Sequence, residues 1–374
     1  MIRIVYGCYK PNTAALNRVL ALVKGLDEEG IKGELVFVYP NKYASKVEVK
    51  YNNFTIKYLW GSHPIKNKML KLLVSFIDIR NYIKKLEEGD RVLVMESLYL
   101  YQFLHLKKLK VYHERTEHPD VVKLSPALLQ NIYLKECRKV DGMFVISTAL
   151  QKYFRGMGIP KVGIVNMIVD SSRFDNLTKT PKREKYIAYC GTASNNKDGV
   201  DRLIKAFCIF NQRVSGYKLY IIGKAPTINE KASNLALVRE LGIDKEVVFK
   251  GLIEAKKMPQ ILYDAEILAL ARPDSLQARC GFPTKLGEYL LTGNPVVLTA
   301  VGDIPKFLIH KETALLSEPD NIEAFANNLM WVAEHKEEAK EIGAMGRKLA
   351  LNEFNYREES KKIIELINED VDNI

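Results

Sequence analysis

The residues with the clearest chemical potential lie between two short apolar segments, 267–271 and 295–298, which have the length and composition of buried strands. Pro283 suits the first turn of a helix between them, because its missing N–H would have no partner there. Lys285 and Glu288 are three positions apart and would share one face of that helix. A cation beside free helix N–H groups suits a phosphate, and the carboxylate suits a diol. The alternative is a surface loop with a structural Lys–Glu pair.

Small and polar residues fill the stretch between the first of these strands and the helix, and we predict a long loop there. The strand ends at Arg272, and the loop holds Gln277, Arg279 and Gly281. The two arginines would add positive charge around the same site.

A second candidate phosphate site follows the predicted strand at 186–190. Gly191 allows a tight turn, and Lys197 comes just before the helix predicted at 199–214, so its ammonium group could meet a phosphate near that helix N-terminus. The alternative is a solvated lysine on a loop.

The densest group of ionisable residues lies in the first half of the chain, at the carboxyl end of a predicted short strand. Groups of this kind are costly to bury and often face a cleft. A solvent-exposed charged loop is the alternative. The candidates are His113, Glu114, Arg115, Glu117 and His118.

Composition limits the class of protein. The chain has 374 residues, 47% of them hydrophobic, which is enough for two cores. Five scattered cysteines without a C-x-x-C pair indicate a reduced, cytoplasmic protein with no disulfide framework and no structural zinc. No signal peptide is evident, and no apolar run approaches the ~20 residues that span a bilayer.

The net charge of +11 favours polyanions such as phosphorylated substrates, anionic lipid or nucleic acid. A helix predicted at 65–86 carries six basic residues against one acid, Asp78, with apolar residues at helical spacing. It could lie on an anionic membrane surface, at the inner face of the plasma membrane, or its apolar stripe could simply be core. Basic residues do not alternate with aromatic ones as in proteins that stack bases, so no nucleic-acid partner is expected.

Strand-like and helix-like segments alternate in two series, which predicts an α/β protein with two Rossmann-like domains and a helical tail. We expect the first domain at 1–170, a polar linker at 171–184, the second domain at 185–352, and a helix at 353–374 that packs back on the first domain. Ligands should bind beyond the carboxyl ends of the strands.

Nearly the whole chain resembles the GT-B glycosyltransferases of family 4 (glycosyl transferases group 1), of the bacterial polysaccharide-biosynthesis type, strongly in the second half and loosely in the first. That family has two glutamates eight positions apart, followed by a Gly-x-Pro-Val strand. Glu288 matches the second glutamate and 293–296 the strand, while Cys280 replaces the first glutamate. Thr192 replaces an arginine that usually follows the first glycine. The loop after the first strand of the chain, where the family is commonly double-glycine, has Asn12 and Thr13.

The resemblance implies a retaining, metal-independent glycosyltransferase, without a cofactor, that moves a sugar from a nucleotide-sugar to a glycan or lipid-linked glycan in cell-surface polysaccharide biosynthesis. Lys197 and Lys285, with Arg272 or Arg279, would stabilise the departing diphosphate. Glu288 would bind the ribose, and Glu117 or His118 would lie near the reacting carbon. Asn12, Thr13, His113, Glu114 and Arg115 would be on the acceptor side. The donor-binding residues would be Gly191, Thr192, Lys197, Lys250, Gly251, Ile253, Arg272, Arg279, Gly281, Lys285, Leu286 and Glu288.

Two other functions remain open at this stage. A nucleotide-sugar epimerase shares the GT-B architecture and would need no second substrate. A non-catalytic sugar- or nucleotide-binding protein is compatible with Cys280 and Thr192 at positions where the family has polar contacts.

Overall fold

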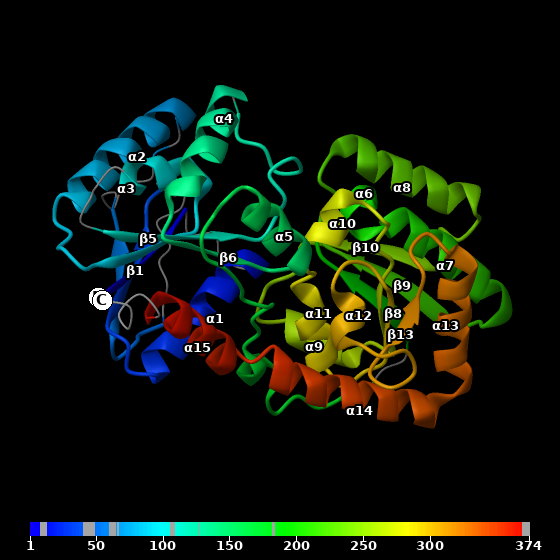
Figure 1. Ribbon diagram of the computed structural model, residues 1–374. Coiled ribbons are helices and arrows are strands. Elements are labelled where there is room, and N and C mark those ends of the chain that lie inside the picture. Colours follow the sequence, from blue (N-terminus) through cyan, green and yellow to red (C-terminus); the bar gives the residue numbers. More distant parts are fainter. Residues whose placement is uncertain are drawn as a thin grey trace. The chain divides into compact units, whose positions relative to one another are not determined.

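The computed structural model describes residues 1–7, 13–39, 49–59, 65, 67–104, 109–125, 127–181 and 184–368. The chain divides into two compact units (Figure 1). Unit 1 comprises Met1–Ile168 and Tyr356–Ile374, and unit 2 comprises Val169–Asn355. Asn12 lies outside the described residues.

Unit 1 contains a seven-stranded parallel sheet with the order β3-β2-β1-β4-β5-β6-β7. The β1 and β2 side chains are largely buried, as expected for a parallel sheet with helices on its faces. The strands are β1 (Ile2–Tyr6), β2 (Gly33–Phe37), β3 (Phe54–Tyr58), β4 (Arg91–Val94), β5 (Lys110–Arg115), β6 (Gly142–Val145) and β7 (Val162–Ile164).

The helices of unit 1 include the last one of the chain, which packs on the first. Gly25 permits this approach, because a Cβ there would lie 2.7 Å from the carbonyl oxygen of Tyr356. The helices are α1 (Ala14–Glu28), α2 (Lys68–Ile83), η1 (Ser97–Tyr99), α3 (Leu100–Leu104), α4 (Ala127–Glu136), η2 (Cys137–Lys139), α5 (Thr148–Gly156) and α15 (Tyr356–Asn368).

Unit 2 contains a six-stranded parallel sheet with the order β10-β9-β8-β11-β12-β13. Counted from the first strand of each unit, both sheets contain the Rossmann order 3-2-1-4-5-6, to which unit 1 adds a seventh strand, and the order reverses beside β1 and beside β8. The strands are β8 (Lys185–Cys190), β9 (Tyr217–Ile222), β10 (Val247–Gly251), β11 (Ile267–Leu270), β12 (Val296–Thr299) and β13 (Leu315–Ser317).

The helices of unit 2 alternate with its strands, and two further helices follow the last strand. The segment predicted as a linker begins with the short helix η3 of this unit. The helices are η3 (Ser171–Phe174), α6 (Asn195–Asp198), α7 (Val200–Arg213), α8 (Ile228–Glu240), α9 (Met258–Asp264), α10 (Leu276–Cys280), α11 (Lys285–Leu291), α12 (Ile304–Phe307), α13 (Ile322–Glu334) and α14 (Lys336–Glu353).

Three local predictions need correction. The stretch with Gln277 and Arg279 is not all loop, because the Ser275 side chain accepts the Ala278 N–H at 3.1 Å and starts α10. The helix predicted from 199 is preceded by a separate turn of helix, α6. The long basic helix is shorter than predicted, since α2 begins after the capping residue Asn67.

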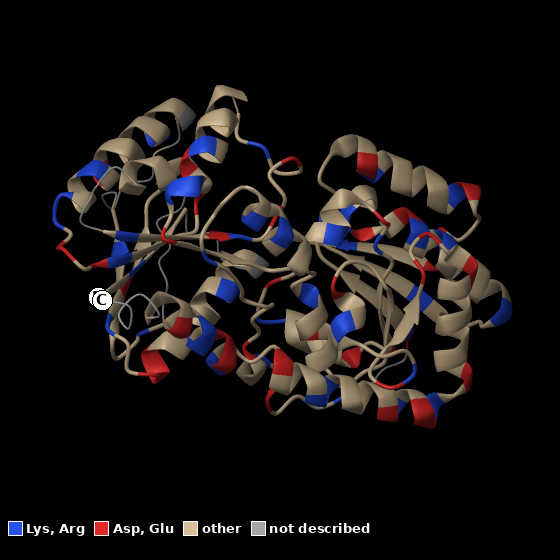
Figure 2. Cartoon of the chain, in the orientation of Figure 1, with Lys and Arg blue, Asp and Glu red and all other residues tan. Residues whose placement is uncertain are grey.

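The charge is divided unequally between the units. Unit 1 contains 30 Lys and Arg against 21 Asp and Glu, a net +9, whereas unit 2 contains 26 against 24. Figure 2 shows both signs interspersed along α14. On α2 the apolar positions do not all face the core: Met69, Leu73 and Ile77 are 75%, 60% and 51% exposed. None of the described helices is long and apolar enough to cross a membrane.

Candidate functional site

Helix α11 lies against the carboxyl end of β8, the point where the strand order of unit 2 reverses. The Tyr289 hydroxyl makes this contact, since it accepts the Cys190 N–H at 2.6 Å and lies 3.3 Å from the Cys190 carbonyl oxygen. Tyr289 is fully buried. The helix that carries Lys285 and Glu288 is therefore held at the edge of the sheet where α/β proteins bind ligands.

Lys285 points back across the end of β8. Its ammonium group forms an ion pair with Asp198 and donates to the Tyr189 hydroxyl at 3.2 Å. The lysine passes over Gly191, whose φ is 148° and where a Cβ would lie 2.8 Å from Lys285 Cε. Gly191 is thus required for both its backbone conformation and this close approach.

The Asp198 carboxyl is 2% exposed. Burial alone would raise its pKa, but the Lys285 ammonium and the hydrogen bonds from Lys285 and Tyr189 hold the pKa below its usual value. Asp198 is therefore ionised at neutral pH, and it neutralises the cation that we predicted to meet a phosphate.

Arg272 is almost fully buried and cross-links the loops of the site. Its guanidinium donates to the carbonyl oxygens of Lys197 at 3.3 Å and Gly281 at 3.3 Å, with a longer contact of 3.5 Å to that of Gln277. It is also close enough to Asp198 to help lower the pKa of that carboxyl. Asp198 therefore has two cations beside it, Lys285 and Arg272, and their excess positive charge favours an anionic ligand.

Glu288 does not pair with Lys285, although both are on α11. Its Oε1 accepts a hydrogen bond from the Arg173 guanidinium on η3. Both side chains are partly buried: Glu288 is 22% exposed and Arg173 is 27% exposed. Burial and, second to it, the nearby Glu288 carboxylate raise the pKa of the Cys190 thiol to about 12, which places Glu288 beside the end of β8 as well.

Lys197 lies on α6, and its side chain is half-buried. The N-terminus of this short helix already has an acidic partner, since the Asn195 N–H donates to the Glu230 carboxylate at 3.0 Å. The helix N-terminus that we expected near Lys197 is that of α7, where the Asp201 N–H donates to the Asn195 side chain at 3.2 Å.

The remaining predicted donor residues fall into different surroundings. Thr192 is exposed and its carbonyl accepts from the Tyr189 hydroxyl at 2.6 Å. Arg279 is half-exposed and pairs with Asp274 at 3.1 Å. Gly281 ends α10, and Leu286 is fully buried in the core. These residues shape the loops around Lys285 rather than adding charge next to it.

The loop predicted to lie beside the nucleotide base follows β10. Lys250 lies over the Tyr220 ring on β9, 4.0 Å from its centroid, so its ammonium group has a cation–π partner within the sheet. Gly251 has a φ of 67° and accepts the Gly223 N–H at 2.7 Å. Ile253 is half-buried just beyond it.

Two of the predicted acceptor-side residues belong to the interior of unit 1. His113 is fully buried: Nδ1 bonds the Val94 carbonyl at 2.6 Å and Nε2 lies 3.2 Å from the Tyr133 hydroxyl. Burial lowers the pKa of His113 to about 4. Glu114 is 9% exposed and pairs with Arg18 at 2.9 Å. Inside the unit these side chains stabilise the fold, which corrects the expectation that they face an acceptor.

Arg115 organises the loop that follows β5. Its guanidinium donates to the Glu117 carbonyl at 2.9 Å, the Ser97 hydroxyl at 2.7 Å and the Val122 carbonyl at 2.7 Å. His118, in this loop, accepts the Asp120 N–H on Nδ1 at 3.2 Å. Burial lowers the pKa of His118. This arrangement favours a neutral imidazole with its proton on Nε2.

Thr13 caps α1, where its hydroxyl accepts the Leu16 N–H at 3.3 Å.

No group of three or more His, Cys, Asp or Glu in the described part of the chain could hold a metal ion.

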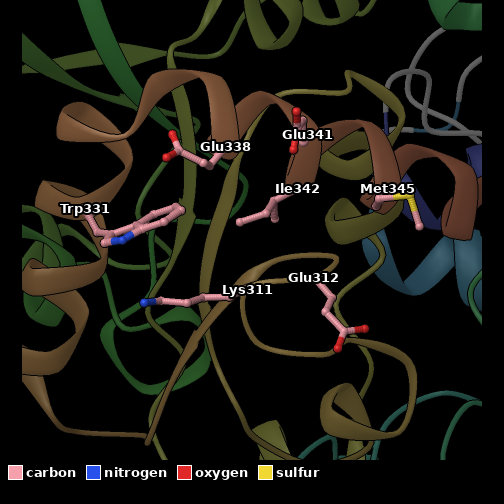
Figure 3. A pocket seen from close by; sticks show the side chains of 7 residues that line it. All are labelled: Lys311, Glu312, Trp331, Glu338, Glu341, Ile342 and Met345. Carbon is pink, nitrogen blue, oxygen red and sulfur yellow. The ribbon is translucent and has the colours of Figure 1, made fainter.

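A separate pocket of 420 Å³ lies elsewhere in unit 2 (Figure 3). None of the predicted site residues line it. Lys311 lies over the Trp331 ring, 5.0 Å from its centroid, and the remaining lining residues are Glu312, Glu338, Glu341, Ile342 and Met345.

Sequence reasoning missed three residues of the site: Asp198, Tyr189 and Arg173. Asp198 directly follows Lys197, which is a signal that could have been weighed. Tyr189 was counted only as part of an apolar strand, and Arg173 fell in the predicted linker. Nothing in the spacing along the chain indicates that Arg173 meets Glu288, 115 residues away.

Most of these residues lie in the part of the chain that matches a known family. Residues 184–335 match the family model described as "Glycosyl transferases group 1". The resemblance to the group 1 glycosyltransferases is thereby confirmed for this part of the chain. It is 25% identical over 213 residues to a GDP-mannose-dependent alpha-(1-6)-phosphatidylinositol monomannoside mannosyltransferase of Mycolicibacterium smegmatis, covering 53% of this chain and 54% of that protein. The chain thus spans about half the length of this relative.

Solved glycosyltransferase structures confirm the GT-B fold over the whole chain. Sucrose-phosphate synthase of Thermosynechococcus elongatus superposes with a TM-score of 0.76 at 16% identity, covering 100% of this chain and 99% of that one. Anabaena Alr3699/HepE, solved with UDP and glucose, gives a TM-score of 0.74 at 14% identity and covers 98% and 99%.

Proposed function

We propose that this chain is a retaining glycosyltransferase that moves a sugar from a nucleotide-sugar to a glycan or lipid-linked glycan in cell-surface polysaccharide biosynthesis. The group 1 family match and the GT-B fold support the general activity. The observation that carries the proposal is the position of α11, which brings Lys285 and Glu288 to the carboxyl end of β8.

The chemistry requires positive charge at the leaving group. As the glycosidic bond stretches, the departing diphosphate gains negative charge, and fixed cations in a dry site stabilise it without a metal ion. Lys285 is the cation best placed for this role, with Lys197 as a second candidate. Arg272 contributes through its field while it holds the loops, because its guanidinium already contacts the carbonyl oxygens of Lys197 and Gly281.

Glu288 would accept hydrogen bonds from the ribose hydroxyls of the donor. On the acceptor side, Glu117 or His118 would lie near the reacting carbon. His118 Nε2 has no hydrogen-bond partner among the described residues, so its N–H is the polar group of that loop that a sugar hydroxyl could use.

A lipid-linked acceptor would be reached at an anionic membrane surface, through the helix predicted at 65–86. Unit 1 carries the net +9 charge, and α2 exposes Met69, Leu73 and Ile77. Basic residues and exposed apolar side chains on one helix are the combination that binds lipid headgroups and the acyl boundary.

Thermal unfolding with UDP, GDP and ADP tests the donor site. A ligand that binds only the folded state at 100 times its Kd stabilises it by about 2.7 kcal/mol, which raises the melting temperature by several degrees. We expect one diphosphate to do so for the native chain and not for Glu288→Ala. Glu337→Ala is the matched control, because Glu337 is an exposed glutamate that pairs with Lys340 at 2.8 Å. A failure of all three nucleotides at millimolar concentration would refute the proposal.

Turnover then separates the transferase from the alternatives. A transferase releases the nucleoside diphosphate only when an acceptor is present, an epimerase needs no acceptor, and a binding protein leaves the donor intact. The anomeric configuration of the product, read by NMR, shows whether the reaction retains the configuration of the donor.

A further inference from the structure

Arg173 has no role in the expectations drawn from the sequence, yet it contacts the carboxylate on which donor binding depends. Its guanidinium donates to Glu288 Oε1. Among the described residues, the Arg173 side chain has no other hydrogen-bonding partner than Glu288, and the Glu288 side chain has no other than Arg173. The bond occupies one oxygen of the carboxylate and leaves Oε2 without a described partner.

Both ends of this contact are held by the fold. Phe174 is 3% exposed and anchors η3 in unit 2, and the Asp170 side chain caps η3 by accepting the Ser172 N–H at 3.1 Å. On the other side, the buried Tyr289 ties α11 to β8. The pair is also partly withdrawn from water, so solvent screens it less than a surface ion pair.

We propose that Arg173 is a positioning residue for the ribose of the donor: it holds the Glu288 side chain in one rotamer, with Oε2 presented to the two hydroxyls of the diol. This inference rests on the proposed function. A carboxylate can accept several hydrogen bonds, so the arginine and a diol can bind it together. Without Arg173, the glutamate would have to be ordered at each binding event, which costs affinity.

The test is isothermal titration calorimetry with the nucleoside diphosphate that stabilises the native chain and with its 2′,3′-dideoxy counterpart. For Arg173→Met we expect the diphosphate to bind about two- to tenfold more weakly, the range given by ordering one side chain. The dideoxy ligand should be affected little, because it lacks the hydroxyls that Glu288 receives. Arg173→Lys, which keeps the charge, should restore part of the affinity.

The Glu288→Gln background separates positioning from a general structural role. If Arg173 acts through Glu288, then Arg173→Met should add little to the loss already caused by Glu288→Gln. The matched control is Arg357→Met, which removes an arginine paired with Glu28 at 2.7 Å in unit 1 and should leave affinity unchanged.

Three results would overturn the inference while leaving the proposed function intact. Unchanged affinity in Arg173→Met would remove Arg173 from the site. An equal loss for both ligands would show a structural defect or a direct contact elsewhere on the nucleotide. Tighter binding would show that Arg173 competes with the donor for Glu288. If the native chain binds none of the nucleotides, the proposed function fails, and the role of Arg173 fails with it.

Discussion

Unit 1 and unit 2 share the strand order 3-2-1-4-5-6, and each carries ionisable side chains near the carboxyl ends of its strands. In unit 1 these side chains all have partners within the unit: His113 bonds a backbone carbonyl, Glu114 pairs with an arginine, and Arg115 bonds a loop. In unit 2, Lys285 and Glu288 also have partners, but those partners leave an excess of positive charge on one side and an unused carboxylate oxygen on the other.

The difference shows that the density of ionisable residues along a sequence is a poor guide to a binding site. The ionisable residues of unit 1 lie closest together in the sequence, and their hydrogen bonds are the most completely satisfied within the unit. Those of unit 2 are spread from 173 to 288, and the fold brings them together around β8. A binding site is indicated by charge and hydrogen-bonding atoms that have no partner within the fold. These atoms can be identified only once the contacts in the structure are known.

Breaking one buried ion pair in each unit gives the largest expected effect. Lys285→Met leaves Asp198 buried with less compensation, and Arg18→Met does the same to Glu114. Removal of one partner of a buried pair costs about 3–5 kcal/mol, so both variants should lose comparable free energy of unfolding in urea denaturation. Only Lys285→Met should also lose binding of the nucleoside diphosphate.

Lys340→Met is the control for this comparison, because its pair with Glu337 is exposed and such pairs contribute at most about 1 kcal/mol. Equal loss of nucleotide binding in Arg18→Met and Lys285→Met would remove the distinction between the two units.

The buried histidine of unit 1 provides a second, smaller effect, on the pH dependence of stability. Burial lowers the pKa of His113 to about 4, whereas in the unfolded chain it is about 6.5. The unfolded state therefore takes up a proton first as the pH falls, so the contribution of His113 is complete above pH 6.5 and is lost towards pH 4. Between about pH 7.5 and 5 this amounts to about 2 kcal/mol.

Urea denaturation of the native chain and of His113→Gln at these two pH values measures the contribution of His113 to the free energy of unfolding. Glutamine can still donate to the Val94 carbonyl and accept from Tyr133, but it does not titrate in this range. The variant should thus show a weaker loss of stability on acidification. His118, whose pKa burial also lowers, is present in both proteins and cancels in the difference. The same pH dependence in both proteins would contradict the assignment.

The fold could be predicted from the sequence because it depends on local patterns. Alternating apolar segments and helical periodicity predicted both parallel sheets and the helical end of the chain. Local signals were also present where the prediction was wrong: Ser275 is a suitable N-cap for α10, which was described as loop. Such errors are correctable by reading the sequence more closely.

The partners of the site residues could not be predicted in the same way. Lys285 and Glu288 do share a face of α11, as their spacing indicated, but a face only limits the direction of a side chain. Lys285 meets Asp198 and Glu288 meets Arg173 because β8, α6 and η3 converge on α11, and that convergence depends on packing between segments about 90 to 115 residues apart. The same limit explains why His113 and Glu114 were expected at a surface.

The smallest effect on stability is expected from replacing exposed apolar residues of α2. This experiment tests what the difference in net charge between the two units does. Leu73 and Ile77 are 60% and 51% exposed, so replacing both with serine removes little buried area and should change the free energy of unfolding by no more than about 0.5 kcal/mol. Binding to vesicles that contain anionic phospholipid should nevertheless fall about tenfold, because these side chains would enter the acyl boundary.

Ile309→Ser is the matched control, because Ile309 is 54% exposed but belongs to the nearly neutral unit 2. It should leave vesicle binding unchanged. Vesicle binding that persists in the double variant of α2, or that falls equally in the control, would show that the excess positive charge of unit 1 does not act at a membrane. The net +9 charge would then act on a soluble polyanionic substrate, since long-range attraction by charge needs no exposed apolar residues. Vesicle binding that is lost in the double variant and kept in the control would show that charge and exposed apolar area act together on α2.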